Sequence, residues 1–232
     1  MPLAVITGGS RGFGRAVTSA LLDEGWHVIT DARNPEDLAA LRNRPHEEQL
    51  TTIPGDVAES DHRQAIASAV KKASGLDLLI NNASELGPSP LPDLLHHPLE
   101  ALQRVYTVNV VAPLALIQLL VPHMTQTAAV VNVSSDAGAE AYPTWGGYGS
   151  SKAALDHVTR VLAAEHPAIA WYAFDPGDMR TGMHQAAYPD EDISDRPEPE
   201  SVVPALLRLL QDRPPSGRYR AADLLEPVPA GV

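Results

Sequence analysis

The sequence predicts an α/β domain in which a parallel β-sheet is covered by helices on both faces. Short apolar runs of strand length recur along the chain, and between them lie segments whose apolar residues repeat at helical spacing. These runs are continuously apolar, which is typical of strands buried on both faces of a parallel sheet. Strands and helices that alternate in this way produce the doubly wound Rossmann architecture.

Six strands are expected, at residues 3–7, 27–30, 50–53, 76–80, 128–135 and 168–174. Helices are expected at residues 14–25, 35–43, 60–74, 98–124, 150–165 and 204–210. Gly25 ends the first helix, Pro35 starts the second, and Pro113 predicts a kink in the long one. We expect residues 1–232 to form a single domain.

One segment, residues 178–201, departs from this alternation. It is polar and acidic, contains Pro189, Pro197 and Pro199, and is too long for an ordinary connection. We expect it to be either a substrate loop that acts as a lid or a disordered insert.

Composition and charge exclude several classes of protein. Of the 232 residues, 44% are hydrophobic and 20% are charged, which fits a globular protein with a core. The formal net charge is −12 and there is no basic run, so nucleic acid and anionic membrane are not expected partners. The absence of cysteine excludes disulfides and thiolate catalysis. The first residues predict a strand, not a signal peptide, and no apolar run approaches the roughly 18 residues of a membrane span. We therefore expect a cytoplasmic protein.

A glycine-rich turn, TGGSRGFG, stands between the first strand and the first helix. Gly8, Gly12 and Gly14 lack Cβ atoms, so the backbone can turn sharply and a pyrophosphate can approach the helix N-terminus. Three glycines also occur in ordinary tight turns, but the position between a strand and a helix favours a dinucleotide site.

A second motif, GGYGSSKAAL, places Tyr148 and Lys152 one helical turn apart. A free phenol has a pKa near 10 and is a poor base at neutral pH. An ammonium group at the i+4 position lies on the same face, favours the phenolate and lowers the tyrosine pKa. By itself the pair is better explained as two residues of a surface helix that have no catalytic role.

Together these features resemble the short-chain dehydrogenase/reductases in their compact single-domain form, over residues 3–225. The landmarks are Asp56 in GDV, Asn81 to Ser84 in NNAS, Asn109 in VNV, Ser135 in VNVSS, Tyr148 and Lys152 in YGSSK, and DPGDMRT at residues 175–181. Ser84 stands where the family usually has glycine. If that position requires a positive φ, serine costs about 1 kcal/mol.

The resemblance implies a role for each landmark in the catalytic set. Tyr148 is the acid/base, and Lys152 is its electrostatic partner and holds the nicotinamide ribose. Ser135 binds the substrate oxygen, and Asn109 holds a water molecule that connects Lys152 to solvent. Ser134 carries the same hydroxyl, but Ser135 has the family's usual separation of thirteen residues from the tyrosine.

The residues after the second strand bear on the choice of cofactor. The acidic position typical of NAD-dependent members falls on Ala32, Arg33 follows it, and Arg11 lies in the glycine loop. Two guanidinium groups can bind the 2′-phosphate of NADP(H), so this cofactor is favoured. NAD(H) is possible, because the carboxylate of Asp31 lies only one residue before Ala32, the usual acidic position. The expected cofactor-binding residues are Thr7, Gly8, Ser10, Arg11, Gly12, Phe13, Gly14, Arg33, Asp56, Val57, Asn82, Ala83, Tyr148, Lys152, Pro176, Gly177, Met179 and Thr181.

The substrate pocket is expected to be lined by the segment after Ser135 and by the long polar loop. Its candidates are Ser135, Tyr142, Trp145, Tyr148, Met179, Met183, His184 and Tyr188. The aromatic and methionine side chains among them are suited to hold an apolar substrate. They are equally suited to pack a lid against the domain or to form a contact between subunits. His96, His97, His123 and His184 lack metal-ligand spacing, so no metal is assigned.

The expected function is that of an NADP(H)-dependent oxidoreductase that interconverts a ketone or aldehyde and an alcohol. The expected partners are a small-molecule substrate and further copies of the chain, as a homodimer or homotetramer. One alternative is a catalytically silent NADP(H)-binding sensor or scaffold, and another is an epimerase or dehydratase on the same fold.

Overall fold

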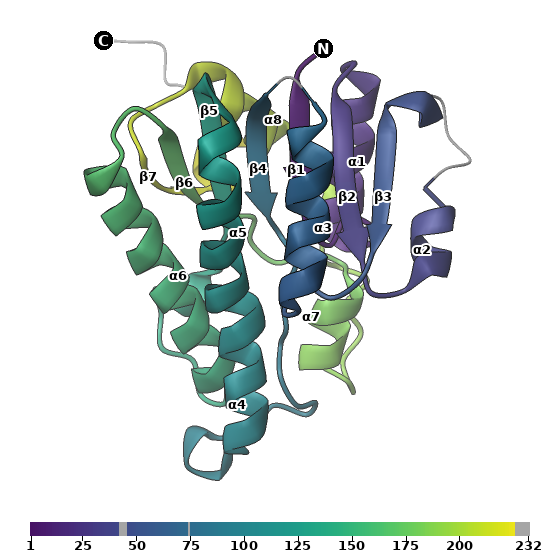
Figure 1. The fold of residues 1–232 in the computed structure, drawn as a ribbon. Helices are drawn as coiled ribbons and strands as arrows, with labels where there is room; N and C mark the ends of the chain where they lie inside the picture. The colour runs from purple at the N-terminus through teal and green to yellow at the C-terminus, as the bar shows by residue number, and fades with distance from the viewer. Residues whose placement is uncertain (42–45, 74, 226–232) are drawn as a thin grey trace, which may run out of the picture.

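The computed structural model describes residues 1–41, 46–73 and 75–225. Within this part of the chain, a parallel sheet of seven strands has the order β3-β2-β1-β4-β5-β6-β7 (Figure 1). This confirms the predicted doubly wound α/β fold. The strands are β1 (Leu3–Ile6), β2 (His27–Ala32), β3 (Leu50–Pro54), β4 (Leu76–Asn81), β5 (Met124–Val133), β6 (Ala170–Asp175) and β7 (Gly217–Arg220).

Helices cover both faces of the sheet (Figure 1). One face carries α1 (Gly12–Asp23), α8 (Val203–Asp212) and α9 (Ala221–Leu225); the other carries α3 (Ser60–Lys71), α4 (Leu99–Tyr106), α5 (Ala112–Leu120) and α6 (Gly146–Glu165). Val17 and Leu21 of α1 and Leu116 of α5 are fully buried against the strands. Burying a side chain of this size contributes about 1.5–3 kcal/mol.

The predicted elements differ from the structure at several boundaries, such as that of β5, which begins at Met124 and not at residue 128. Three further differences concern the edge of the sheet and two helices. The edge strand β7 was not predicted, because its sequence GRYR contains no apolar run and its residues are only partly buried. The second helix, α2, is Pro35–Ala39 and ends earlier than expected. Residues 42–43, the end of that expected helix, and residue 74, the end of the next one, lie outside the described residues. Helix α6 begins at Gly146, four residues before the predicted start, so Tyr148 lies in its first turn.

The long segment after β4 is helical through Pro113, as expected, but its irregularity precedes the proline. A π-helical turn, Thr107–Val111, joins α4 to α5, and a 3₁₀ turn, Val121–His123, follows α5. Pro113 has no N–H to donate to the carbonyl four residues earlier, which is that of Asn109. Within Leu99–His123 a window of 18 residues has a mean hydropathy of 1.8, so by length and composition this stretch is apolar enough to cross a membrane. In this fold it packs against α3 and α6 in one helical layer.

Residues 178–201 contain regular structure that the sequence did not predict. Helix α7 (Gly182–Ala187) and a 3₁₀ turn, Pro199–Ser201, lie within this segment. Thr181 caps α7, because its hydroxyl accepts a hydrogen bond from the N–H of His184 at 3.2 Å. Figure 1 shows α7 near the carboxyl ends of the strands, where ligands bind in open α/β sheets.

Candidate active site

A cavity of about 1070 Å³ lies at the carboxyl ends of the strands. It brings together the glycine loop, the ends of β2, β5 and β6, the start of α6 and the segment with α7. The predicted residues that line it are Gly8, Ser10, Arg11, Gly12, Phe13, Arg33, Asp56, Val57, Asn82, Ala83, Ser135, Tyr142, Trp145, Tyr148, Lys152, Pro176, Gly177, Met179, Thr181, Met183, His184 and Tyr188. Thr7, Gly14 and Asn109 do not line the cavity.

The glycine loop is held against the segment that follows β4. The hydroxyl of Thr7 accepts hydrogen bonds from the N–H groups of Asn82 and Ala83, both at 3.0 Å. A Cβ on Gly14 would lie 2.4 Å from the Asn82 amide nitrogen, so no side chain fits there. Among the described residues no side chain caps the N-terminus of α1 at Arg11, and Gly12 and Phe13 of its first turn line the cavity. These residues fit a dinucleotide pyrophosphate.

Both oxygens of the Asp31 carboxylate have partners in the protein. One oxygen accepts a hydrogen bond from the N–H of Gly8 at 2.7 Å, and the other lies 2.7 Å from Nε2 of His62. Asp31 is 2% exposed. It therefore positions the glycine loop, and because it also lines the cavity, the alternative of NAD(H) stays a prediction.

Arg11 and Arg33, the two predicted phosphate-binding arginines, both line the cavity. Arg33 is 56% exposed at its side chain and forms an ion pair with Glu85 at 3.3 Å. An exposed ion pair of this kind contributes at most about 1 kcal/mol. Arg33 can therefore exchange Glu85 for a dianionic phosphate at little cost.

Asp56, another of the predicted cofactor-binding residues, also lines the cavity. Burial would raise its pKa, but a hydrogen bond from the N–H of Ala58 at 2.9 Å and the guanidinium of Arg104 together hold the pKa of Asp56 below its usual value. The carboxylate stays ionised and is a hydrogen-bond acceptor.

Tyr148, Ser135 and Ser84 all line the cavity. Burial raises the pKa of Tyr148 above its usual value, while hydrogen bonds with the hydroxyls of Ser84 and Ser135 act in the opposite direction. The phenol therefore stays protonated at neutral pH. Ser135, and not Ser134, interacts with the phenol, in agreement with the spacing argument.

Lys152 lies behind Tyr148 and is buried with it. Its ammonium lies 5.4 Å from the centre of the Tyr148 ring and donates to the carbonyl of Val133 at 2.8 Å. Burial lowers the pKa of Lys152 to about 8, and the carboxylate of Asp156 opposes this shift. The sequence predicts that Lys152 lowers the pKa of Tyr148; in the structure burial outweighs that effect, because both groups have lost their water.

The side-chain amide of Asn109 is bound by protein groups, and the water molecule that the resemblance implies at this residue stays a prediction. Its Oδ1 accepts hydrogen bonds from the Ser84 hydroxyl at 3.1 Å and the Glu85 N–H at 2.8 Å. Its Nδ2 donates to the Glu85 carbonyl and the Ser151 hydroxyl, both at 2.9 Å. All four hydrogen-bonding positions of the amide are occupied by protein groups. Asn109 thus ties the segment after β4 to α6.

Ser84 is a site residue whose contribution the sequence reasoning missed. Its backbone is not in the left-handed region, so the expected cost of serine in place of glycine does not arise. Its hydroxyl joins Tyr148 to Asn109. The only sequence signal was the departure from the family pattern in NNAS.

An aromatic wall lines the cavity beside Tyr148. The ring of Trp145 lies 5.9 Å from those of Tyr148 and Tyr188, and the ring of His184 lies 5.0 Å from that of Tyr188. Met183 of α7 packs on the same cluster. The predicted pocket residues therefore both form the cavity wall and hold α7 in place.

Comparison with known proteins agrees with this geometry. The short chain dehydrogenase family matches residues 2–192. Benzil reductase ((S)-benzoin forming) of Bacillus subtilis is 31% identical over 79% of this chain and 76% of its own length. Sepiapterin reductase of Bos taurus is 32% identical over 80% of this chain and 75% of its own length. A short chain dehydrogenase of Shigella flexneri, solved in complex with NADP, has a TM-score of 0.88 at 27% identity and covers 95% of this chain and 97% of its own. With its parallel sheet, glycine loop and Ser135–Tyr148–Lys152 cluster, the chain belongs to the short-chain dehydrogenase/reductase family of oxidoreductases.

Proposed function

We propose that the protein is an NADP(H)-dependent reductase of neutral ketones or aldehydes, with Tyr148 as its proton donor. The observation that carries this proposal is the buried phenol of Tyr148, which interacts with the hydroxyls of Ser135 and Ser84 and whose ring centre lies 5.4 Å from the ammonium of Lys152. The NADP bound to the Shigella flexneri relative, together with Arg11 and Arg33 at the cavity, supports the choice of cofactor.

Each catalytic side chain has a defined task in this scheme. A bound nicotinamide cofactor supplies the hydride. Ser135 donates a hydrogen bond to the substrate oxygen and holds it beside Tyr148. Tyr148 transfers its proton to that oxygen, and the ammonium of Lys152 stabilises the phenolate that remains. The aromatic wall excludes water from the reacting atoms.

The rate of reduction is expected to fall as the pH rises through about 8. Below this value Lys152 is protonated and stabilises the developing phenolate; above it Lys152 is neutral, because burial lowers its pKa to about 8. Tyr148 keeps its proton over the same range, since its pKa is raised. The pH profile of kcat measures this decrease in rate. A kcat that stays constant well above this pH would contradict the role of Lys152.

The shape and charge of the cavity favour a substrate with an aromatic group beside the carbonyl. Trp145, Tyr188 and Met183 provide apolar surface next to Tyr148. Asp136, Asp178 and Glu200 also line the cavity, while Arg180 of the same lining is already paired with Glu198, which disfavours a substrate carboxylate. The relative named for its action on benzil, an aromatic diketone, supports the same class.

A substrate panel with NADPH tests this proposal. Aromatic ketones such as benzil are expected to have a kcat/KM about tenfold or more above that of small aliphatic ketones, because burying a ring contributes at least 1.5 kcal/mol or so. Consumption of NADPH, followed by its absorbance, is the measurement. A preference for 2-keto acids would overturn the substrate class, and NADPH binding without turnover of any carbonyl would favour the silent sensor.

The expected homo-oligomer and the cytoplasmic location stay predictions. Val111, beside α5, and Val161, on α6, are 55% and 40% exposed and suit a contact between copies through these helices. Sedimentation of the purified protein would measure the number of copies.

A further inference from the structure

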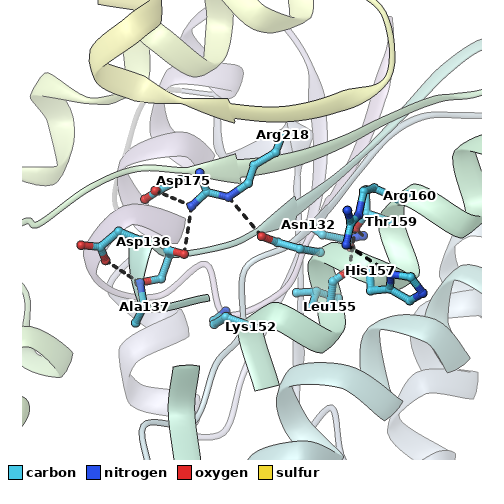
Figure 2. Close-up of polar contacts among 12 residues, drawn as sticks. Asn132, Asp136, Ala137, Lys152, Leu155, His157, Thr159, Arg160, Asp175 and Arg218 are labelled. Atoms are coloured by element: carbon cyan, nitrogen blue, oxygen red, sulfur yellow. Dashed lines mark hydrogen bonds and ion pairs between the residues drawn. The ribbon is translucent and has the colours of Figure 1, made fainter. Parts of the chain in front are cut away.

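Arg218 is a charged residue of β7 that contacts three different parts of the site. Its Nη2 donates to the carbonyl of Ser135 at 3.0 Å and to Oδ2 of Asp175 at 2.8 Å, and its Nε donates to Oδ2 of Asp156 at 3.1 Å. Figure 2 shows the guanidinium at the centre of these contacts. Arg218 lies outside the residues 2–192 that match the family.

The contact with Asp175 links Arg218 to the loop after β6. Asp175 has a side chain that is 4% exposed, and its second oxygen accepts a hydrogen bond from the N–H of Gly177 at 3.0 Å. Gly177 has φ = +73° and lines the cavity. The carboxylate of Asp175 therefore stands between Arg218 and a loop that we expect to hold the cofactor.

The other two contacts link Arg218 to the catalytic residues. The carbonyl it binds belongs to Ser135, whose hydroxyl interacts with Tyr148. Asp156 lies one helical turn after Lys152 on α6. Burial raises the pKa of Asp156, and Arg218 opposes this by stabilising the carboxylate. That carboxylate in turn favours the charged form of Lys152.

A lysine could not replace this arginine. The guanidinium is planar and presents several donors in fixed directions, whereas an ammonium is a compact point charge. The acceptors come from three elements: the loop after β5, helix α6 and the end of β6. Only a side chain with several donors in fixed directions can bind all of these acceptors at once and fix their positions relative to one another.

We propose that Arg218 is a positioning residue that couples the substrate-binding Ser135 and the Lys152 helix to the cofactor loop at Asp175. This inference rests on the proposed function, which makes Ser135 and Lys152 catalytic. Arg218 itself is expected to touch neither substrate nor cofactor.

The variants R218M and R218K test the proposal. R218M keeps an apolar side chain but loses the hydrogen-bond donors of the guanidinium. We expect kcat to fall about tenfold to 100-fold, because a displacement of the reacting groups by about an ångström lowers the rate by up to that factor. The dissociation constant for NADPH is expected to rise in parallel. Hydrogen exchange should become faster at the amide of Gly177, which is bonded to Asp175. R218K keeps the charge and is expected to recover only part of the loss.

The matched control is R220M, which removes a guanidinium from the same strand but affects an exposed ion pair with Asp223. If R218M and R218K match R220M in kcat, in NADPH affinity and in exchange at Gly177, the proposal is overturned. If R218M does not fold, R218K decides by the same readouts. If no variant and not even the wild type reduces any carbonyl, the proposed function fails, while exchange at Gly177 and NADPH affinity still decide the role of Arg218.

Discussion

Replacing Tyr148 with phenylalanine is expected to lower kcat for carbonyl reduction by about 100- to 10,000-fold, the range that general acid catalysis contributes. The substitution removes only the hydroxyl, and the ring keeps its packing against Trp145. Affinity for NADPH, measured by fluorescence titration, should therefore stay close to that of the wild type. Single-turnover kinetics with the best substrate of the panel measures the loss in the chemical step.

Tyr219→Phe is the matched control for this prediction. It also removes one phenolic hydroxyl, but that hydroxyl donates to the carbonyl of Pro215 at 2.7 Å, outside the cavity. Its kcat is expected to equal that of the wild type. Substantial turnover by Y148F would show that another group donates the proton, and the assigned mechanism would then be wrong.

Arg33→Gln is expected to weaken the binding of NADPH by about tenfold to 100-fold and to leave the binding of NADH nearly unchanged. A charge-assisted hydrogen bond contributes about 1.5–3 kcal/mol, and each 1.4 kcal/mol or so corresponds to a factor of ten in affinity. NADH lacks the 2′-phosphate and so does not use this contact. Calorimetric titration with the two cofactors measures both affinities.

Glu85→Gln provides a test in the opposite direction. It removes the carboxylate that pairs with Arg33 at 3.3 Å, so the guanidinium is released and a negative charge near the phosphate is lost. NADPH should bind more tightly to this variant than to the wild type. Equal losses of NADPH and NADH affinity in R33Q would instead assign Arg33 a structural role, and preference for NADP(H) would then need another source.

Much of the fold could be predicted from local pattern. Central strands such as β1 and β4 are buried on both faces, so burial alone requires a continuous apolar run that the sequence displays. Strand β7 and helix α7 could not be predicted in this way. Within the described residues β7 is a short, partly buried edge strand that pairs only with β6. Helix α7 is stabilised by its Thr181 cap and by packing on the aromatic cluster.

The sequence by itself determined those parts of the site whose chemistry depends on local spacing. Tyr148 and Lys152 share a face of α6 because they are one turn apart, and the glycine loop can turn because three of its residues lack Cβ. The tertiary structure decided everything that depends on residues distant in the chain. Asp31 accepts a hydrogen bond from the N–H of Gly8 in the glycine loop, and the amide oxygen of Asn109 accepts one from the N–H of Glu85. Arg218 donates to the carbonyl of Ser135, which lies 83 positions earlier in the chain.

The ionisation of the catalytic pair also depended on the tertiary structure. Spacing alone predicts a lowered pKa for Tyr148, since it counts the nearby ammonium but not the lost water. In the folded protein both side chains are buried, so each charged form is disfavoured: the pKa of Tyr148 rises and that of Lys152 falls to about 8. Charge proximity is visible in a sequence motif, but desolvation is a property of the packed structure around it.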